Sequence, residues 1–96
     1  MQIKLSDYIA GWLTKHNVKH VFTVTGGAMH LNDAFGHHPR MQCIYNHHEQ
    51  ACAMAAEGYY KTSGKLPAVC VTSGPGGTNA ITGALGAWLD SVPMLI

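Results

Sequence analysis

One carboxylate stands out in this 96-residue sequence because of the residues around it. In the segment YNHHEQACAMAAEGYY, which covers residues 45–60, Glu49 follows two histidines, and no residue from Ala51 to Ala56 is larger than Met54. Only 11% of the residues are charged, whereas about a quarter is usual for a soluble domain. An acid in such a charge-poor segment is a candidate for proton chemistry rather than for an ordinary surface charge.

The two histidines next to this acid raise the question of a metal site. A zinc-binding HExxH helix that starts at His48 would need its second histidine at position 52, which is Cys52. Side chains of adjacent residues leave a strand in opposite directions, so His47 and His48 are poorly placed to share one ion. The sequence therefore predicts no metal ligands in this chain.

Two glycine-rich segments could also take part in binding. Gly26 and Gly27 follow the segment HVFTVT, and SGPGGTN, residues 73–79, follows AVCVT. Glycines let a flat or anionic group approach the backbone closely, although a glycine pair after a strand often forms only a turn. The second segment lacks both the lysine of a GxxxxGK[ST] loop and the GxGxxG spacing, so it is a weak signal for a phosphate loop.

Alternating secondary structure is expected to position these segments. Hydrophobic spacing and stop signals predict helices over residues 5–18 (with Ser6 as N-cap), 28–36, 49–62 and 77–91, and strands over residues 20–26, 42–47, 68–74 and 92–96. This alternation predicts an α/β fold with a parallel sheet and helices on both faces. Because ligands of such sheets bind beyond the carboxyl ends of the strands, residues 25–28, 47–50 and 73–79 are expected at one functional edge.

Composition excludes several classes of protein. The net charge is only +1 with no basic stripe, which argues against nucleic acid binding, and no apolar run approaches the roughly 20 residues that span a bilayer. Three cysteines without CxxC spacing, in a chain without a signal peptide, are typical of reduced thiols in the cytoplasm and are expected to be small buried hydrophobes.

The chain is small, and its surface is expected to be covered by other protein. It is long enough for one domain at most, and its predicted last strand, 92–96, has no helix to cover it, so we expect the first part of a longer polypeptide. The many small residues of helices 49–62 and 77–91 favour a subunit interface. Tight packing within one domain is the alternative.

Three segments carry a resemblance to a known family: NVKHVFTVTGGA (17–28), NHHEQACAMAAEGYYKTSGK (46–65) and VTSGPGGTNAITGALGAWLDSVPMLI (71–96). Together they resemble the N-terminal pyrimidine-binding (PYR) domain of thiamine-diphosphate-dependent enzymes, in the acetolactate synthase-like branch. The resemblance runs over essentially the whole chain. It implies a flavodoxin-like parallel sheet, incomplete at the C-terminus, with residues 1–96 as the N-terminal part of the domain and no second domain.

The resemblance also implies roles for individual residues. Glu49 matches the catalytic glutamate that binds N1′ of the cofactor's aminopyrimidine, and Pro75 and Asn79 match positions beside that ring. Gly26 and Gly27 match a glycine pair on the cofactor-facing loop, where Thr25 replaces the proline of many members.

An acid in this role must be able to gain and lose a proton. Burial among alanines raises the pKa of a carboxyl group, whereas a helix N-terminus lowers it. For Glu49 we expect burial to dominate.

For the intact protein, the resemblance implies a carboligase that acts on pyruvate or a similar 2-oxo acid. The cofactor would be thiamine diphosphate. A second domain with a GDG…N motif, which this chain lacks, would hold the diphosphate and Mg²⁺, usually from a neighbouring subunit of a homodimer or homotetramer. FAD could be an additional cofactor. These residues alone are expected to be inactive. The alternatives are a 2-oxo acid decarboxylase of the same family, a truncated non-catalytic interaction module, and a nucleotide-binding flavodoxin-like domain.

Overall fold

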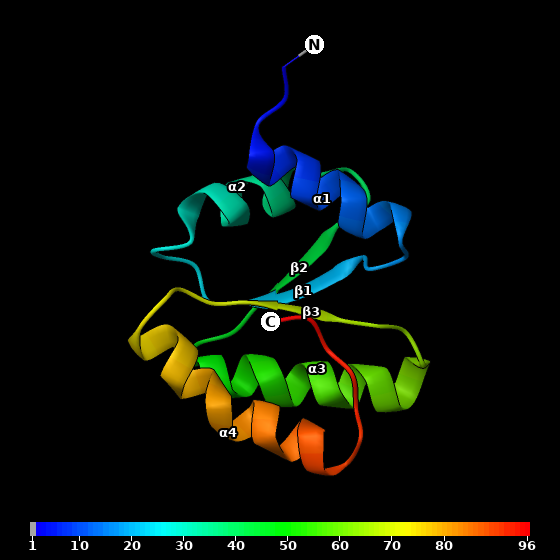
Figure 1. Ribbon diagram of the computed structural model, residues 1–96, viewed down its shortest axis with the longest axis vertical. Helices are drawn as coiled ribbons and strands as arrows, with labels where there is room; N and C mark the ends of the chain where they lie inside the picture. Colours follow the sequence, from blue (N-terminus) through cyan, green and yellow to red (C-terminus); the bar gives the residue numbers. More distant parts are fainter. Residues whose placement is uncertain (1) are drawn as a thin grey trace.

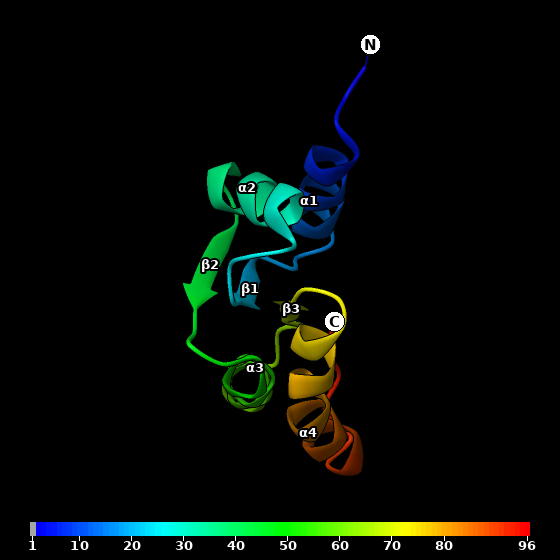
Figure 2. The same cartoon turned by 90° about the vertical axis from the view of Figure 1, so that its left-hand side faces the viewer.

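Helices and strands alternate along residues 2–96, which the computed structural model describes. The elements are α1 (Leu5–Lys15), β1 (His20–Thr23), α2 (Met29–His37), β2 (Gln42–Tyr45), α3 (Glu49–Ser63), β3 (Ala68–Cys70) and α4 (Pro75–Leu89). The strands form a parallel sheet in the order β2-β1-β3. Helices α1 and α2 cover one face of the sheet, and α3 and α4 cover the other (Figures 1 and 2). The predicted α/β fold with a parallel sheet is confirmed.

Strand β1 separates two apolar layers of the core. Val21 packs with Leu13 of α1 and Phe35 of α2, whereas Phe22 packs with Cys52 of α3. Successive side chains of a strand point to opposite faces, which explains this division. The buried residues of β1 and all of β3 are therefore covered on both sides, as the near-continuous apolar runs in the sequence predicted.

Several predicted boundaries differ from those of the structure. Ser6 is not the cap of α1, because Lys4 occupies the N-cap position and makes no side-chain capping bond. Helix α3 ends at Ser63, one residue beyond the predicted end. Gly64 follows it with φ 71°, and its N–H donates to the Tyr60 carbonyl at 2.7 Å. Helix α4 begins at Pro75, two residues earlier than expected, because proline suits the first position of a helix.

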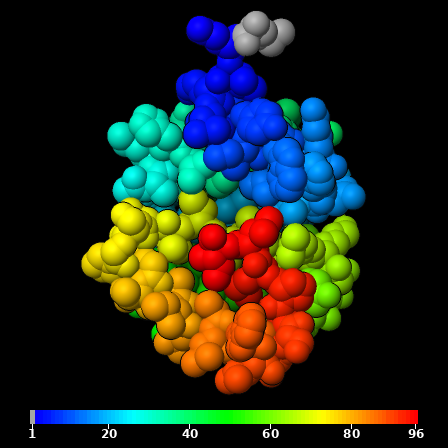
Figure 3. Space-filling model, in the orientation of Figure 1, coloured from blue at the N-terminus to red at the C-terminus, as the bar shows by residue number. Residues whose placement is uncertain are grey.

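The fourth strand that residues 92–96 were predicted to begin is present only as a single bridge. Residues 92–96 form one isolated parallel bridge, between Leu95 and Ala68, in which the Val69 N–H donates to the Leu95 carbonyl at 2.7 Å. This segment lies on the surface between α1 and α4 in Figure 3.

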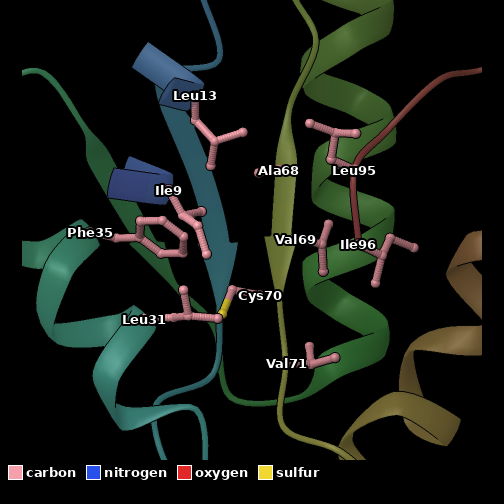
Figure 4. Close-up of a pocket in the computed structure, with 10 residues that line it drawn as sticks. All are labelled: Ile9, Leu13, Leu31, Phe35, Ala68, Val69, Cys70, Val71, Leu95 and Ile96. Atoms are coloured by element: carbon pink, nitrogen blue, oxygen red, sulfur yellow. The ribbon is translucent and has the colours of Figure 1, made fainter. Parts of the chain in front are cut away.

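An apolar cavity of about 260 Å³ adjoins residues 92–96. It is lined by side chains of α1, α2, β3 and residues 95–96 (Figure 4). Its lining is apolar apart from the Cys70 thiol, whose pKa is raised by burial, so the cavity is poorly suited to proton chemistry.

The three cysteines are free thiols. Cys52 and Cys70 are buried and Cys43 is partly buried. Burial raises the pKa of each thiol, that of Cys52 to about 11, so the reactive thiolate is disfavoured at neutral pH. Cys52 and Cys70 therefore serve as small buried hydrophobes, as the sequence indicated.

Small residues bring α3 and α4 into close contact. A Cβ added at Gly83 of α4 would lie 2.5 Å from the Ala53 Cβ and 3.2 Å from both the Gln50 carbonyl oxygen and the Met54 nitrogen of α3. The α3 backbone thus passes directly against Gly83. Tight packing within the domain, the alternative explanation for these small residues, is confirmed at this contact.

We expect Gly83→Ala to lower the free energy of unfolding by about 1–3 kcal/mol, because the added methyl group would push the α3 backbone away. Gly86→Ala on the same helix is the matched control. A Cβ at Gly86 meets nothing within 4 Å, so that variant should gain up to about 1 kcal/mol from helix propensity. Urea unfolding of both variants measures the difference, and equal stabilities would contradict the close contact.

Candidate functional site

The three turns expected at one edge of the sheet lie there. The β1–α2, β2–α3 and β3–α4 connections all leave the carboxyl ends of the parallel strands, at the left-hand side of Figure 1, which faces the viewer in Figure 2. These connections contain the glycine pair, the acid and the second glycine-rich segment. The edge is therefore the candidate site.

Glu49 is the first residue of α3, and its neighbour His48 caps that helix. The Gln50 N–H donates to His48 Nδ1 at 3.0 Å, so the imidazole is used as an N-cap. Backbone N–H groups at a helix N-terminus are free to bind a negative charge. The sequence thus places a carboxylate where the helix itself stabilises the ionised form.

Asn79 of α4 fixes the orientation of this carboxylate. Its Nδ2 donates a hydrogen bond to Glu49 Oε2 at 3.1 Å, which joins the start of α3 to the first turns of α4. The second carboxylate oxygen, Oε1, faces Gly76 and lies 3.7 Å from where a Cβ on Gly76 would be. One oxygen is therefore held by the protein, and the other lies beside a residue without a side chain.

The expectation that burial raises the pKa of Glu49 is wrong for this chain. The backbone N–H of Glu49 itself lowers the pKa below its ordinary value of 4.5, the Asn79 amide lowers it further, and His48 adds a smaller effect. Desolvation acts in the opposite direction and is outweighed, because the side chain is only partly buried at an open edge. In this chain the carboxyl group is ionised at neutral pH and accepts hydrogen bonds.

Thr72, which sequence analysis did not single out, connects the two glycine-rich turns. It follows β3 and lies against Gly76 on one side and Gly27 on the other: a Cβ at Gly76 would come within 2.8 Å of Thr72 Cγ2, and a Cβ at Gly27 would overlap Thr72 Oγ1. The available signal was its position near the end of the predicted strand 68–74, next to the second glycine-rich segment. That signal does not distinguish it from its neighbours.

Some of the predicted site residues contact one another, and others do not. Glu49 and Asn79 are in direct contact, and Gly27 is joined to the same cluster through Thr72. Pro75 begins α4, and its carbonyl accepts a hydrogen bond from Thr78 Oγ1 at 3.1 Å. A Cβ at Gly26 would meet nothing within 4 Å, so this glycine borders open space. Their binding and catalytic roles stay predictions.

Below the edge, side-chain hydrogen bonds tie the sheet to α2. Thr23 Oγ1 donates to the Cys70 carbonyl at 2.6 Å and accepts from Asn32 Nδ2 at 2.9 Å. These bonds connect β1 with β3 and with the helix that follows the glycine pair. The ends of β1 and β3 that support the site are therefore held to each other and to α2.

The described residues form neither a metal-binding cluster nor a membrane-spanning helix. No three His, Cys, Asp or Glu side chains among residues 2–96 are grouped as a metal ion would require. Within the same residues, every helix is too short or too polar to traverse a bilayer. The acid and glycines at the sheet edge remain the arrangement best suited to chemistry.

Comparison with known proteins gives a consistent result. The family described as "Thiamine pyrophosphate enzyme, N-terminal TPP binding domain" matches residues 3–96. The chain is 47% identical over 92 residues to the acetolactate synthase large subunit of Lactococcus lactis subsp. lactis, an alignment that covers 95% of this chain and 16% of that protein.

Other acetolactate synthases show similar agreement. The large subunit of Haemophilus influenzae is 47% identical over 92 residues, which cover 95% of this chain and 16% of that protein. The chloroplastic enzyme of Arabidopsis thaliana is 40% identical over 94 residues, which cover 96% of this chain and 14% of that protein. The chain thus spans only a small part of the length of these curated relatives.

We expect Asn79→Ala to raise the pKa of Glu49 toward its ordinary value of 4.5, because one of the hydrogen bonds that stabilise the carboxylate is lost. The folded-state pKa is lowered, so this bond stabilises the fold above pH 4.5, and its contribution disappears as the pH falls through the lowered value. A carbon-13 NMR titration of the Glu49 carboxyl group measures the change.

Thr82→Ala provides the matched control for this titration, since Thr82 is exposed on the next turn of α4. The control should leave the pKa of Glu49 unchanged. An unchanged pKa in Asn79→Ala as well would show that Asn79 does not stabilise the carboxylate.

Proposed function

The chain belongs to the thiamine pyrophosphate enzyme family as its N-terminal TPP-binding domain, and from this premise we propose that it supplies the pyrimidine side of the cofactor site in an acetolactate synthase-like carboligase. The cofactor that this domain indicates is thiamine diphosphate. The proposed substrate is pyruvate or a similar 2-oxo acid. The observation that carries the proposal is the Glu49–Asn79 pair at the carboxyl edge of the sheet.

The residues at this edge fit a flat aminopyrimidine ring. Such a ring needs a carboxylate that can hydrogen-bond to a ring nitrogen. It also needs backbone without large side chains next to its flat face. Glu49 Oε2 is held by Asn79, which leaves Oε1 to take part in a bond to N1′. Gly26 borders open space, which suits a turn that a cofactor or substrate must approach.

When bound, thiamine diphosphate supplies an electron sink for the decarboxylation of a 2-oxo acid. The part of this chain is to hold and move one proton. Glu49 exchanges it with N1′ of the ring, while Asn79 keeps the carboxyl group in the required orientation. This exchange requires a pKa closer to neutrality than the isolated chain provides, and burial of the edge by a second domain would raise it.

We place the remaining parts of the cofactor site outside this chain. The five acidic residues of the sequence include no GDG…N motif, so Mg²⁺ and the diphosphate would be held by another domain. FAD, if the intact enzyme uses it, would also bind elsewhere. The catalytic unit is therefore proposed to be larger than residues 1–96.

Helix α4 supports the proposal of a homo-oligomer with the site at the subunit interface. Its buried face carries small residues such as Ala80 and Gly83, whereas its exposed face carries a stripe of large apolar side chains, namely Ile81 (58% exposed), Leu85 (54%), Trp88 (81%) and Leu89 (72%). A stripe of this kind is usually covered by other protein, and in this proposal a second copy covers it. The stripe begins about two turns past Pro75, so a second copy that packs on it would also approach the Glu49 edge.

Removal of the proposed proton carrier provides the main test of function. In the full-length protein, Glu49→Gln is expected to lower hydrogen–deuterium exchange at C2 of bound thiamine diphosphate by at least about 100-fold, the usual scale for loss of a general acid or base. Cofactor binding should persist, because glutamine keeps a hydrogen-bonding group beside the ring.

Glu57→Gln on the same helix is the control, since Glu57 pairs with Lys61 at 3.2 Å, away from the edge. That variant should exchange at the normal rate. Near-normal exchange in Glu49→Gln would remove Glu49 from the mechanism. Product analysis of the wild-type protein then separates a carboligase, which forms a new carbon–carbon bond, from a decarboxylase, which releases an aldehyde.

The interface is tested by two matched leucines. Leu89 of α4 is 72% exposed and Leu5 of α1, on the other face of the sheet, is 74% exposed. We expect Leu89→Lys to weaken self-association by about ten- to a hundredfold, since burial of a leucine side chain contributes about 1.5–3 kcal/mol. Sedimentation velocity measures this, and Leu5→Lys should associate normally. Equal association of the two variants would place the interface elsewhere.

A further inference from the structure

Thr72 lies where the candidate site's two glycine-rich turns meet. It follows β3, whereas Gly27 belongs to the β1–α2 turn and Gly76 to the first turn of α4. A single side chain is thus placed between segments that are far apart in the sequence. Its two branches face different glycines.

The γ-methyl group of Thr72 faces Gly76. A Cβ added there would lie 2.8 Å from Thr72 Cγ2, a separation that real Cβ atoms do not show, but 3.6 Å from Thr72 Cβ and 3.7 Å from Glu49 Oε1, which are ordinary contacts. The methyl group therefore occupies the space that a side chain at Gly76 would need. It also approaches the same side of Gly76 as the free oxygen of Glu49.

The hydroxyl group of Thr72 faces Gly27. A Cβ at Gly27 would overlap Thr72 Oγ1 and would lie 3.1 Å from Thr72 Cβ. Each glycine is thus excluded from carrying a side chain by the same threonine.

We propose that Thr72 is a positioning residue that sets the spacing between the Gly26–Gly27 turn and the Glu49 carboxylate. This inference rests on the proposed function, in which Glu49 exchanges a proton with the cofactor ring. Thr72 acts through Gly76 in the first turn of α4, and the next turn carries Asn79, whose side chain holds Glu49. A small displacement of this turn misaligns the carboxyl group, and misplacement of about 1 Å can cost up to about a hundredfold in rate.

The test is a double-mutant cycle in the full-length protein with Thr72→Ser and Gly76→Ala. Gly76→Ala alone should lower exchange at C2 of bound thiamine diphosphate by about tenfold, because the new methyl group meets Thr72 Cγ2. Serine lacks that γ-methyl group. The double variant should therefore exchange within about threefold of Thr72→Ser alone, a non-additive result that marks direct contact.

Rates are compared per molecule of bound cofactor, so that loss of folded protein does not contribute. Gly86→Ala is the control, because a Cβ at Gly86 meets nothing within 4 Å on the same helix. It should exchange at the wild-type rate. Additive effects of the two substitutions on exchange would overturn the positioning role.

Thermal unfolding of the same proteins separates this inference from the proposed function. The double variant should melt at a higher temperature than Gly76→Ala, which tests the contact without any cofactor. If the melting temperatures are coupled and the wild-type protein promotes no exchange at all, the proposed function fails while the contact stands. If the melting temperatures are not coupled, the inference about Thr72 fails whatever the activity.

Discussion

The close approach of α3 and α4 determines where the Glu49 carboxylate of the candidate site can lie. Gly83, in the middle of α4, lies against the first turns of α3, with the α3 backbone 3.2 Å from the position of an added Cβ. Nearer to the helix N-termini, this proximity lets the Asn79 amide reach Glu49 Oε2 at 3.1 Å. The orientation of the acid therefore depends on residues that take no part in chemistry. The small side chains of α4 give the edge its geometry, and its large side chains are left for an outer surface.

Electrostatics at this edge depend on how much of the site is present. In the chain by itself, the backbone N–H of Glu49 and the Asn79 amide stabilise the carboxylate more than partial burial destabilises it, so the pKa is lowered. A proton carrier needs the opposite balance. Because the same hydrogen bonds would persist when a second domain covers the edge, desolvation is the quantity that can change on assembly. The structure thus agrees with a site in which Asn79 already orients Glu49 in the isolated chain. The pKa of Glu49 would then rise when a second domain covers the edge.

The fold was predictable from sequence because its signals are local. Apolar runs that alternate with helical periodicity were sufficient for the parallel sheet and for the edge where the turns meet. The start of α4 was misplaced because Pro75 and Gly76 look like loop residues, yet Gly76 is required inside the helix where Thr72 leaves no room for a side chain. The largest cause of the lowered Glu49 pKa, its own backbone N–H at the start of α3, is local, but the further lowering by Asn79 is not. That contact and the position of Thr72 join segments distant in sequence, and no local pattern encodes them.

The central claim is that the Glu49 carboxyl group binds the pyrimidine ring of the cofactor. A crystal structure of the full-length protein with thiamine diphosphate tests it most directly. The account predicts one carboxyl oxygen of Glu49 within about 2.6–3.2 Å of N1′, the range of a proton-transferring hydrogen bond, with Asn79 still bound to the other oxygen. A ring that sits elsewhere, or a Glu49 side chain turned away from N1′, would contradict it.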